Sequence, residues 1–345
     1  CSGSLRRMVQ SRAMIRRERA SSPKNSPEEA QSPFIPAIDT HIHLFDPGRP
    51  EGVPWPDKTD GVLYRAALPG RYRRVTSGLG IVGAIAVECS PWPEDNQWVL
   101  DLAAKHKIIV GVVGNLEPGD ARFRKDLERL SQNPLFRGIR YGNLWGRNLA
   151  QQLSRQAFRS GLQALADAGL SLDTANPDPA LITAVVRLTD RIPGLRVVVD
   201  HLPQLNPPTP SRDRAAFEAT LKELATRPHV YVKVSEVLRR AGGLVPYDVD
   251  FYKPRLDELW ETFGPDRLIY GSDWPNSDQW GPYRQVLEVV RKYFRGKGAA
   301  AAEKFFWRNS TAAYRWSPRD RRQPAQPEAP MASKQQGLKP ASSLS

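Results

Sequence analysis

The chain has 345 residues, of which 40% are hydrophobic, so it can form one large domain or two ordinary ones. Cys1 and Cys89, its two cysteines, give neither a disulfide framework nor a CxxC metal motif, and no apolar run reaches the roughly 18 residues of a membrane span. Residues 1–30 and 317–345 carry seven of the thirteen net positive charges. The rest of the chain has no basic block interleaved with aromatic residues, which argues against nucleic-acid binding.

Both ends of the chain are rich in Ser, Pro, Ala and Gln and lack apolar periodicity. We therefore expect residues 1–33 and 317–345 to be disordered tails around a single domain at 34–316. Cys1 at the first position has two interpretations. It is either the lipid-bearing start of a mature lipoprotein, or the sequence is a fragment or upstream extension whose true start lies near Met14. We favour the second and expect a cytoplasmic protein.

Eight short apolar runs between the tails have the composition of parallel strands covered on both faces. They span residues 37–44, 82–88, 108–114, 136–142, 170–175, 196–202, 230–236 and 267–274. Amphipathic, helix-like stretches follow most of them, at 95–106, 121–132, 154–169, 179–191, 212–227, 279–294 and 301–316. This alternation predicts an α/β fold, a single (β/α)8 TIM barrel. The connection at 45–80 is rich in Pro and Gly, contains Trp55 and lacks a clear helix.

Nearly every predicted strand ends in a polar or charged residue after an apolar body. These residues are His41, His43, Glu88, Asn115, Arg140, Asp173, His201, Lys233 and Asp273. The carboxyl ends of the strands of a TIM barrel meet at one mouth, where the chemistry of such enzymes takes place. The pattern therefore predicts one catalytic site.

Two of the five histidines, His41 and His43, lie two residues apart on the first strand, so their side chains face the same side. His201 ends the sixth strand. Asp273 ends the eighth, which neighbours the first once the barrel closes. Three imidazoles and one carboxylate form a ligand set for a divalent metal ion, and zinc matches these donors best.

Six segments taken in order resemble the amidohydrolase superfamily over about residues 36–316. They are "DTHIHLFDP", "FRGIRYG", "VVVDHLP", "VYVKVSE", "YGSDWPN" and "FFWRNSTAAYRW". The sequence is most similar to the amidohydrolase-related branch that includes pyrone-dicarboxylate lactonase and fuconolactonase-type sugar lactonases. The resemblance implies a (β/α)8 barrel and hydrolysis, often of a lactone. It also implies that Asp273 is the general base and that the family's histidine positions correspond to His41, His43 and His201.

The sequence also departs from the superfamily pattern. Two-metal members carry a bridging Lys or Glu at the fourth strand and a His at the fifth, where this chain has Arg140 and Asp173. We therefore expect at most one divalent ion. Some relatives in this branch work without metal, so the resemblance leaves one ion and none as alternatives.

Lactone opening needs an activated water and stabilisation of the oxyanion that forms. We expect Asp273, with His201, to serve catalysis, and a metal ion to lower the pKa of the water if one is present. Arg140 and Lys233 are expected to bind a substrate carboxylate. Glu88 either lines the site or pairs with a neighbouring arginine. The remaining candidates for substrate contact are Asp173 and Asn276.

The preferred interpretation is a lactonase acting on a small carboxylated or sugar-acid substrate. A second is a non-oxidative decarboxylase of the same superfamily. A third is an inactive barrel that serves as a binding protein, against which the intact histidine and aspartate set argues. We expect a small-molecule substrate, no nucleic-acid partner and no transmembrane segment. The sequence leaves open whether the protein forms a homo-oligomer.

Overall fold

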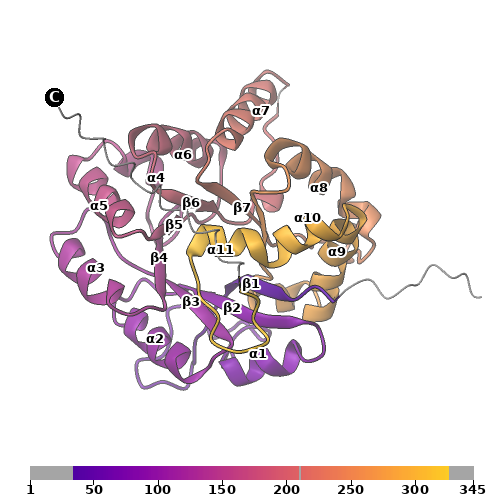
Figure 1. Ribbon diagram of the computed structural model, residues 1–345, viewed down its shortest axis with the longest axis horizontal. Helices are drawn as coiled ribbons and strands as arrows, with labels where there is room; N and C mark the ends of the chain where they lie inside the picture. Colours follow the sequence, from indigo (N-terminus) through magenta and orange to yellow (C-terminus); the bar gives the residue numbers. More distant parts are fainter. Residues whose placement is uncertain (1–33, 210, 326–345) are drawn as a thin grey trace, which may run out of the picture. The chain divides into compact units, whose positions relative to one another are not determined.

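The computed structural model describes residues 34–209 and 211–325, which fold around one eight-stranded parallel sheet. Each strand pairs with the next one in the chain. The strands are β1 (Ala37–Ile42), β2 (Ile81–Val87), β3 (Ile109–Gly114), β4 (Phe136–Arg140), β5 (Ser171–Asp173), β6 (Arg196–Val199), β7 (Val230–Val234) and β8 (Leu268–Tyr270). Helices surround this ring of strands (Figure 1), so the predicted (β/α)8 barrel is confirmed.

At least one helix follows every strand. The helices are α1 (Pro69–Val75), α2 (Asp95–Lys105), α3 (Phe123–Ser131), α4 (Leu149–Gln152), α5 (Gln156–Asp167), α6 (Pro179–Arg191), α7 (Ser211–Ala225), α8 (Val249–Phe263), α9 (Tyr283–Gly296), α10 (Ala299–Glu303) and α11 (Asn309–Tyr314), with short turns η1 (Leu202–Gln204), η2 (Asn276–Gln279) and η3 (Lys304–Arg308). The connection at 45–80, which shows no clear helix in the sequence, contains α1. This helix buries only Pro69 and Tyr72, so its sequence shows no apolar period.

The barrel closes between β1 and the segment that follows the short strand β8. The backbone N–H of Asp273 donates to the carbonyl of His41 at 2.9 Å, and that of His43 donates to the carbonyl of Trp274 at 2.7 Å. The predicted neighbourhood of the first and last strands is therefore confirmed. This junction brings the two histidines of β1 alongside Asp273.

Aliphatic side chains fill the barrel interior, and aromatic residues from the end of the chain close it. The buried cluster includes Ile38, Val110, Val198, Ile269, Trp307 and Tyr314. Asn309 donates to the carbonyl of Leu268 at the start of β8 at 2.9 Å, and Arg196 at the start of β6 donates to the carbonyl of Ala313 at 2.8 Å. The helix α11 thus covers the amino-terminal end of the barrel, and the polar strand ends lie at the other.

Residues 317–325, which belong to the predicted C-terminal tail, pack against the barrel. The guanidinium of Arg319 donates to the carbonyl of Ile109 at 2.6 Å. The side chain of Gln323, which is only 5% exposed, donates to the carbonyl of Val82 at 3.0 Å. These contacts satisfy backbone carbonyls of the barrel, so the folded part reaches beyond the expected boundary at residue 316.

The predictions for the N-terminal tail, for Cys1 and for residues 326–345 lie outside the described residues. Within the described ranges, no helix combines the length and the apolar composition that crossing a bilayer requires.

Candidate active site

A cavity of about 170 Å³ opens at the carboxyl ends of the strands. Five residues predicted from the sequence lie on its wall, namely His43, Arg140, His201, Asp273 and Asn276. Loops after β1 and β4 add the rings of Trp55 and Trp145. The cavity therefore combines aromatic walls with a small group of polar side chains, as small-molecule sites commonly do.

His43 and Asp273 face each other at the centre of this wall. The ring nitrogen Nδ1 of His43 lies 3.0 Å from the carbonyl oxygen of Val87, which can only accept, so Nδ1 carries the hydrogen. Burial lowers the pKa of His43 to about 4, so the ring is neutral and Nε2 carries a lone pair. The Nε2 atom lies 3.1 Å from Oδ1 of Asp273, which is also an acceptor. A proton or a cation between the two atoms removes their repulsion.

Asp273 is held in an unusual backbone conformation. Its φ of 60° lies in the left-handed region, which residues other than glycine rarely adopt. Its second carboxylate oxygen accepts a hydrogen bond of 2.6 Å from the amide of Asn276. Burial is the main cause that raises the pKa of Asp273, to about 6. This carboxylate is therefore a stronger base than an exposed aspartate and is still ionised at neutral pH.

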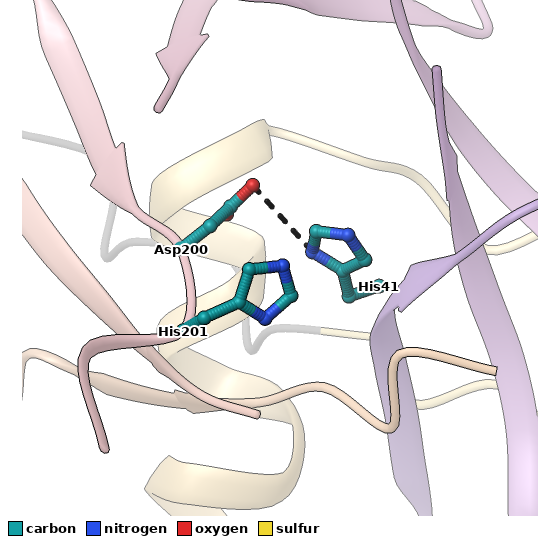
Figure 2. A group of neighbouring side chains, drawn as sticks. All are labelled: His41, Asp200 and His201. Atoms are coloured by element: carbon teal, nitrogen blue, oxygen red, sulfur yellow. Dashed lines mark ion pairs between the residues drawn. The ribbon is translucent and has the colours of Figure 1, made fainter. Parts of the chain in front are cut away.

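His41 lies just beneath, fully buried, and its Nε2 is 3.5 Å from the same Oδ1 of Asp273. This Nε2 has no hydrogen-bond partner among the described residues. On the other side of the ring, Nδ1 lies 3.6 Å from Asp200 and 3.2 Å from the ammonium group of Lys233. Figure 2 shows the contact between His41 and Asp200, with the imidazole of His201 beside it. Nδ1 thus has an acceptor and a donor nearby, and either tautomer of His41 has a partner.

Arg140 connects the histidines to the acidic residues. Its Nη2 donates to Nε2 of His201 at 3.2 Å, and Nδ1 of that histidine lies 2.8 Å from the hydroxyl of Ser235. The Nε of Arg140 donates to Asp200 at 3.1 Å. Nη1 makes no hydrogen bond within the described part of the chain, and its nearest acid is Glu88 at 3.9 Å. The guanidinium is thus fixed on two sides, with both N–H groups of Nη1 and one of Nη2 left over.

Lys233 and Asp173 lie below the cavity and do not line it. Both side chains are completely buried, and they form an ion pair of 2.7 Å. The ammonium group also lies 2.9 Å from Asp200, and the hydroxyl of Tyr314 donates to Asp173 at 2.6 Å. The structure therefore brings these two predicted residues close to the site, under His41, but not to its surface.

Glu88 lies beside Arg140, which is the second of the two arrangements expected for it, and it is not among the residues that line the cavity. Its Oε2 accepts a hydrogen bond of 3.1 Å from the indole N–H of Trp145, and its Oε1 lies 3.9 Å from Nη1 of Arg140. It thus helps to hold an aromatic wall of the cavity. Asn115, another polar strand end, donates from its side chain to the carbonyl of Ser90, and its backbone exchanges two hydrogen bonds with the side-chain amide of Asn96.

Two acidic residues of the site, Asp200 and Glu236, were missed in the sequence. Asp200 directly precedes His201, so strand alternation assigns it to the outer face. In the structure, however, β6 ends at Val199 and His201 is left-handed (φ 55°), so the alternation stops before it reaches them. Glu236 is likewise left-handed at φ 50°, and it accepts a 2.9 Å hydrogen bond from Asn276. Burial and then the charge of Asp273 raise its pKa to about 9. The feature of the sequence that could have revealed Asp200 and Glu236 is their position, since each lies at the very end of an apolar run.

Carboxyl groups outnumber cations around the cavity. Five carboxyl groups are buried or nearly buried against two cations: Glu88, Asp173, Asp200, Glu236 and Asp273 against Arg140 and Lys233. Burial raises the pKa of four of the five carboxyl groups. Separately, His41, His43 and Asp273 present three ligand atoms within 4.8 Å of one another. The excess of carboxyl groups, the orphaned nitrogen of His41 and the lone pair of His43 all fit one divalent ion.

The model of the amidohydrolase family matches residues 38–316, so this chain belongs to the amidohydrolase family. It is 30% identical over 246 residues to an L-fucono-1,5-lactonase of Burkholderia ambifaria, a match that covers 70% of this chain and 80% of the relative. It is 26% identical over 286 residues to a 4-sulfomuconolactone hydrolase of Rhizobium radiobacter, covering 79% and 89%.

The fold is shared with solved amidohydrolases. The crystal structure of an amidohydrolase from Burkholderia multivorans, determined with bound zinc, superposes with a TM-score of 0.70. The two sequences are 23% identical, and the match covers 82% of this chain and all of the other. The predicted membership of the amidohydrolase superfamily, in a branch with lactonases, is therefore confirmed.

Proposed function

We propose that this protein is a lactonase that opens a small carboxylated or sugar-acid lactone with water activated by Asp273. The observation that carries the proposal is the presence, in one cavity, of a buried basic carboxylate and a guanidinium with free N–H groups, those of Asp273 and Arg140. Relatives that share up to 30% of the sequence are named as lactone hydrolases, which supports the same chemistry.

Asp273 is assigned the role of general base. Its oxygen takes a proton from water as the water oxygen attacks the carbonyl carbon of the lactone, and its raised pKa strengthens it for this step. The ring C–O bond then breaks, and the proton passes from Asp273 to the departing alkoxide. The overall reaction adds one water and yields a hydroxy acid.

Arg140 is assigned to the carbonyl oxygen and to the negative charge that develops there. Its bonds to His201 and Asp200 fix the guanidinium before the substrate arrives, which is the arrangement that lowers the cost of stabilising an oxyanion. In this proposal His201 orients Arg140 instead of transferring a proton, because both of its ring nitrogens are already engaged.

His41, His43 and Asp273 are the residues that would hold a divalent ion, which supplies Lewis-acid polarisation of an oxygen atom when bound. Zinc suits these donors best. The proposal places Lys233 and Asp173 beneath this group as supports of His41, since neither reaches the cavity. Substrate contacts then fall to Arg140, to Asn276 and to the two tryptophans.

The proposal is tested with a lactone panel. Purified protein is incubated with 1,4- and 1,5-lactones of sugar acids and with muconolactones, and ring opening is followed as acid release with a pH indicator. We expect opening of at least one class well above the spontaneous rate, and loss of that activity in Asp273→Asn. No opening of any lactone, together with release of CO₂ from aromatic carboxylates, would instead support the decarboxylase alternative.

A further inference from the structure

Asp39, two residues before His41, is a completely buried carboxylate that faces away from the cavity. Five donors surround it. Oδ1 accepts from the backbone N–H groups of His41 at 3.2 Å and Ser272 at 2.8 Å, and Oδ2 accepts from the hydroxyls of Ser272 at 2.6 Å, Tyr283 at 2.8 Å and Tyr72 at 2.9 Å. These donors come from β1, from α1, from α9 and from the segment after β8. One side chain therefore ties four parts of the barrel together.

Asp39 is linked through Ser272 to both chain neighbours of Asp273, which are Ser272 and Trp274. The Ser272 hydroxyl donates to Asp39 and accepts the backbone N–H of Trp274 at 3.0 Å. The residue between these two bonds is Asp273, whose left-handed backbone is unfavourable by itself. The strand β8 ends at Tyr270, so regular sheet pairing does not reach this turn. Its geometry depends on the bonds to Asp39 and on the backbone bonds of the barrel junction.

We propose that Asp39 is a positioning residue, which holds the Asp273 turn against β1 so that its carboxylate meets His41 and His43. The proposal rests on the proposed function only in taking Asp273 as the base. Asp39 touches neither the cavity nor any group assigned to substrate. Its loss therefore acts on the rate of the chemical step and leaves substrate binding nearly unchanged.

The test compares Asp39→Ala with a matched control, Tyr270→Phe. The hydroxyl of Tyr270 belongs to the same buried cluster, where it donates to Tyr283 at 3.2 Å and is not one of the donors to Asp39. We expect Asp39→Ala to lower kcat roughly 10²-fold, the usual cost of a small misplacement of a catalytic group, with KM little changed. Tyr270→Phe is expected to lower Tm and to keep the wild-type kcat.

A second readout is independent of lactone chemistry. Hydrogen exchange followed by mass spectrometry is measured for a peptide over residues 268–280 and for one over β4. We expect faster exchange of 268–280 in Asp39→Ala than in Tyr270→Phe, with β4 unchanged in both. If the wild type opens no lactone, the proposed function fails, and this readout still decides the role of Asp39.

Ser272→Ala is the second variant, in case Asp39→Ala does not fold. It removes the hydroxyl between Asp39 and Trp274 and keeps the carboxylate, so it is expected to lower kcat and to speed exchange in the same peptide. Normal kcat per folded molecule in the variants that fold, or exchange of 268–280 equal to that in Tyr270→Phe, would overturn the proposal.

Discussion

Nε2 of His43 lies 3.1 Å from Oδ1 of Asp273, and both atoms are acceptors. The neutral tautomer of His43 that carries its hydrogen on Nε2 is unfavourable, because Nδ1 donates its hydrogen to the carbonyl of Val87. Two acceptors at this distance are stable only with a proton or a cation between them. The pair is therefore suited to take up a proton or to hold a metal ion, and the predictions below follow from these two uses.

The rate of the proposed reaction depends on pH through Asp273. Burial raises the pKa of this carboxyl to about 6, and the base acts only when it is ionised. We expect kcat/KM to be constant above about pH 7 and to fall about tenfold per pH unit below pH 6. Burial lowers the pKa of His43 to about 4, so its protonation does not interfere in this range. A profile that stays flat from pH 8 to pH 5 would be incompatible with Asp273 as the base.

Because the fourth strand carries Arg140 in place of a bridging Lys or Glu, we expect at most one divalent ion per chain, bound by His41, His43 and Asp273. Elemental analysis of protein purified without chelator checks this number. Where an ion is found, its removal by a chelator is expected to lower Tm, because binding to the folded state alone stabilises it. A reproducible content near two ions per chain would contradict the single site.

Lys233 balances two buried carboxylates, so we expect Lys233→Met to lower the free energy of unfolding by about 3–5 kcal/mol. Denaturant unfolding measures the loss. The double variant Lys233→Met with Asp173→Asn removes one of the stranded charges, while Asp200 keeps its bond to Arg140. We therefore expect this variant to recover part of the stability. A double variant that is less stable than Lys233→Met would show that the ion pair between Lys233 and Asp173 is not the main electrostatic interaction of Lys233.

The segment 317–325 is expected to contribute to stability. A chain that ends at residue 316 loses the hydrogen bonds from Arg319 and Gln323 to barrel carbonyls. We expect it to be less stable than a chain that ends at residue 325 by about 1.5–3 kcal/mol, the range for hydrogen bonds to charged groups. Arg319→Ala in the longer chain should show much of this loss in thermal unfolding. Equal Tm values for the two chains would mean that these contacts add nothing.

The sequence predicted the barrel and most of its mouth because both follow from simple periodicities. Solid apolar runs marked the eight strands, and the polar residue at each run's end marked the position of the site. His41, His43 and Asp273 came together as expected, since the first and last strands of a closed barrel are neighbours.

The remaining residues could not be predicted because they depend on backbone conformation beyond the strands. Asp200 turns towards the site only because β6 stops at Val199 and His201 is left-handed. Lys233 was expected at the cavity surface, but the structure places its ammonium under His41 between two buried acids. Whether a strand-end charge meets substrate or another side chain is a question of tertiary distances, which periodicity does not contain.

Asp273→Asn preserves the shape of the site. The amide oxygen can accept from Asn276, and the amide N–H can donate to the lone pair of His43, so the variant should fold. The raised pKa of Asp273 also determines how the free energy of unfolding changes with pH. The folded wild type keeps the Asp273 proton up to about pH 6, whereas the unfolded chain loses it near 3.8, so wild-type stability falls as pH rises through this window. Removing the carboxyl removes that cost, and we expect Asp273→Asn to be at least as stable as the wild type at pH 7.

The central claim is that Asp273 is the catalytic base, and the most direct measurement is kcat of Asp273→Asn alongside Tm on the same preparation. We predict that kcat on the best lactone falls by at least about 10²–10⁴-fold, the usual contribution of general-base catalysis, while Tm at pH 7 does not fall. A folded Asp273→Asn variant with near-wild-type turnover would contradict the account.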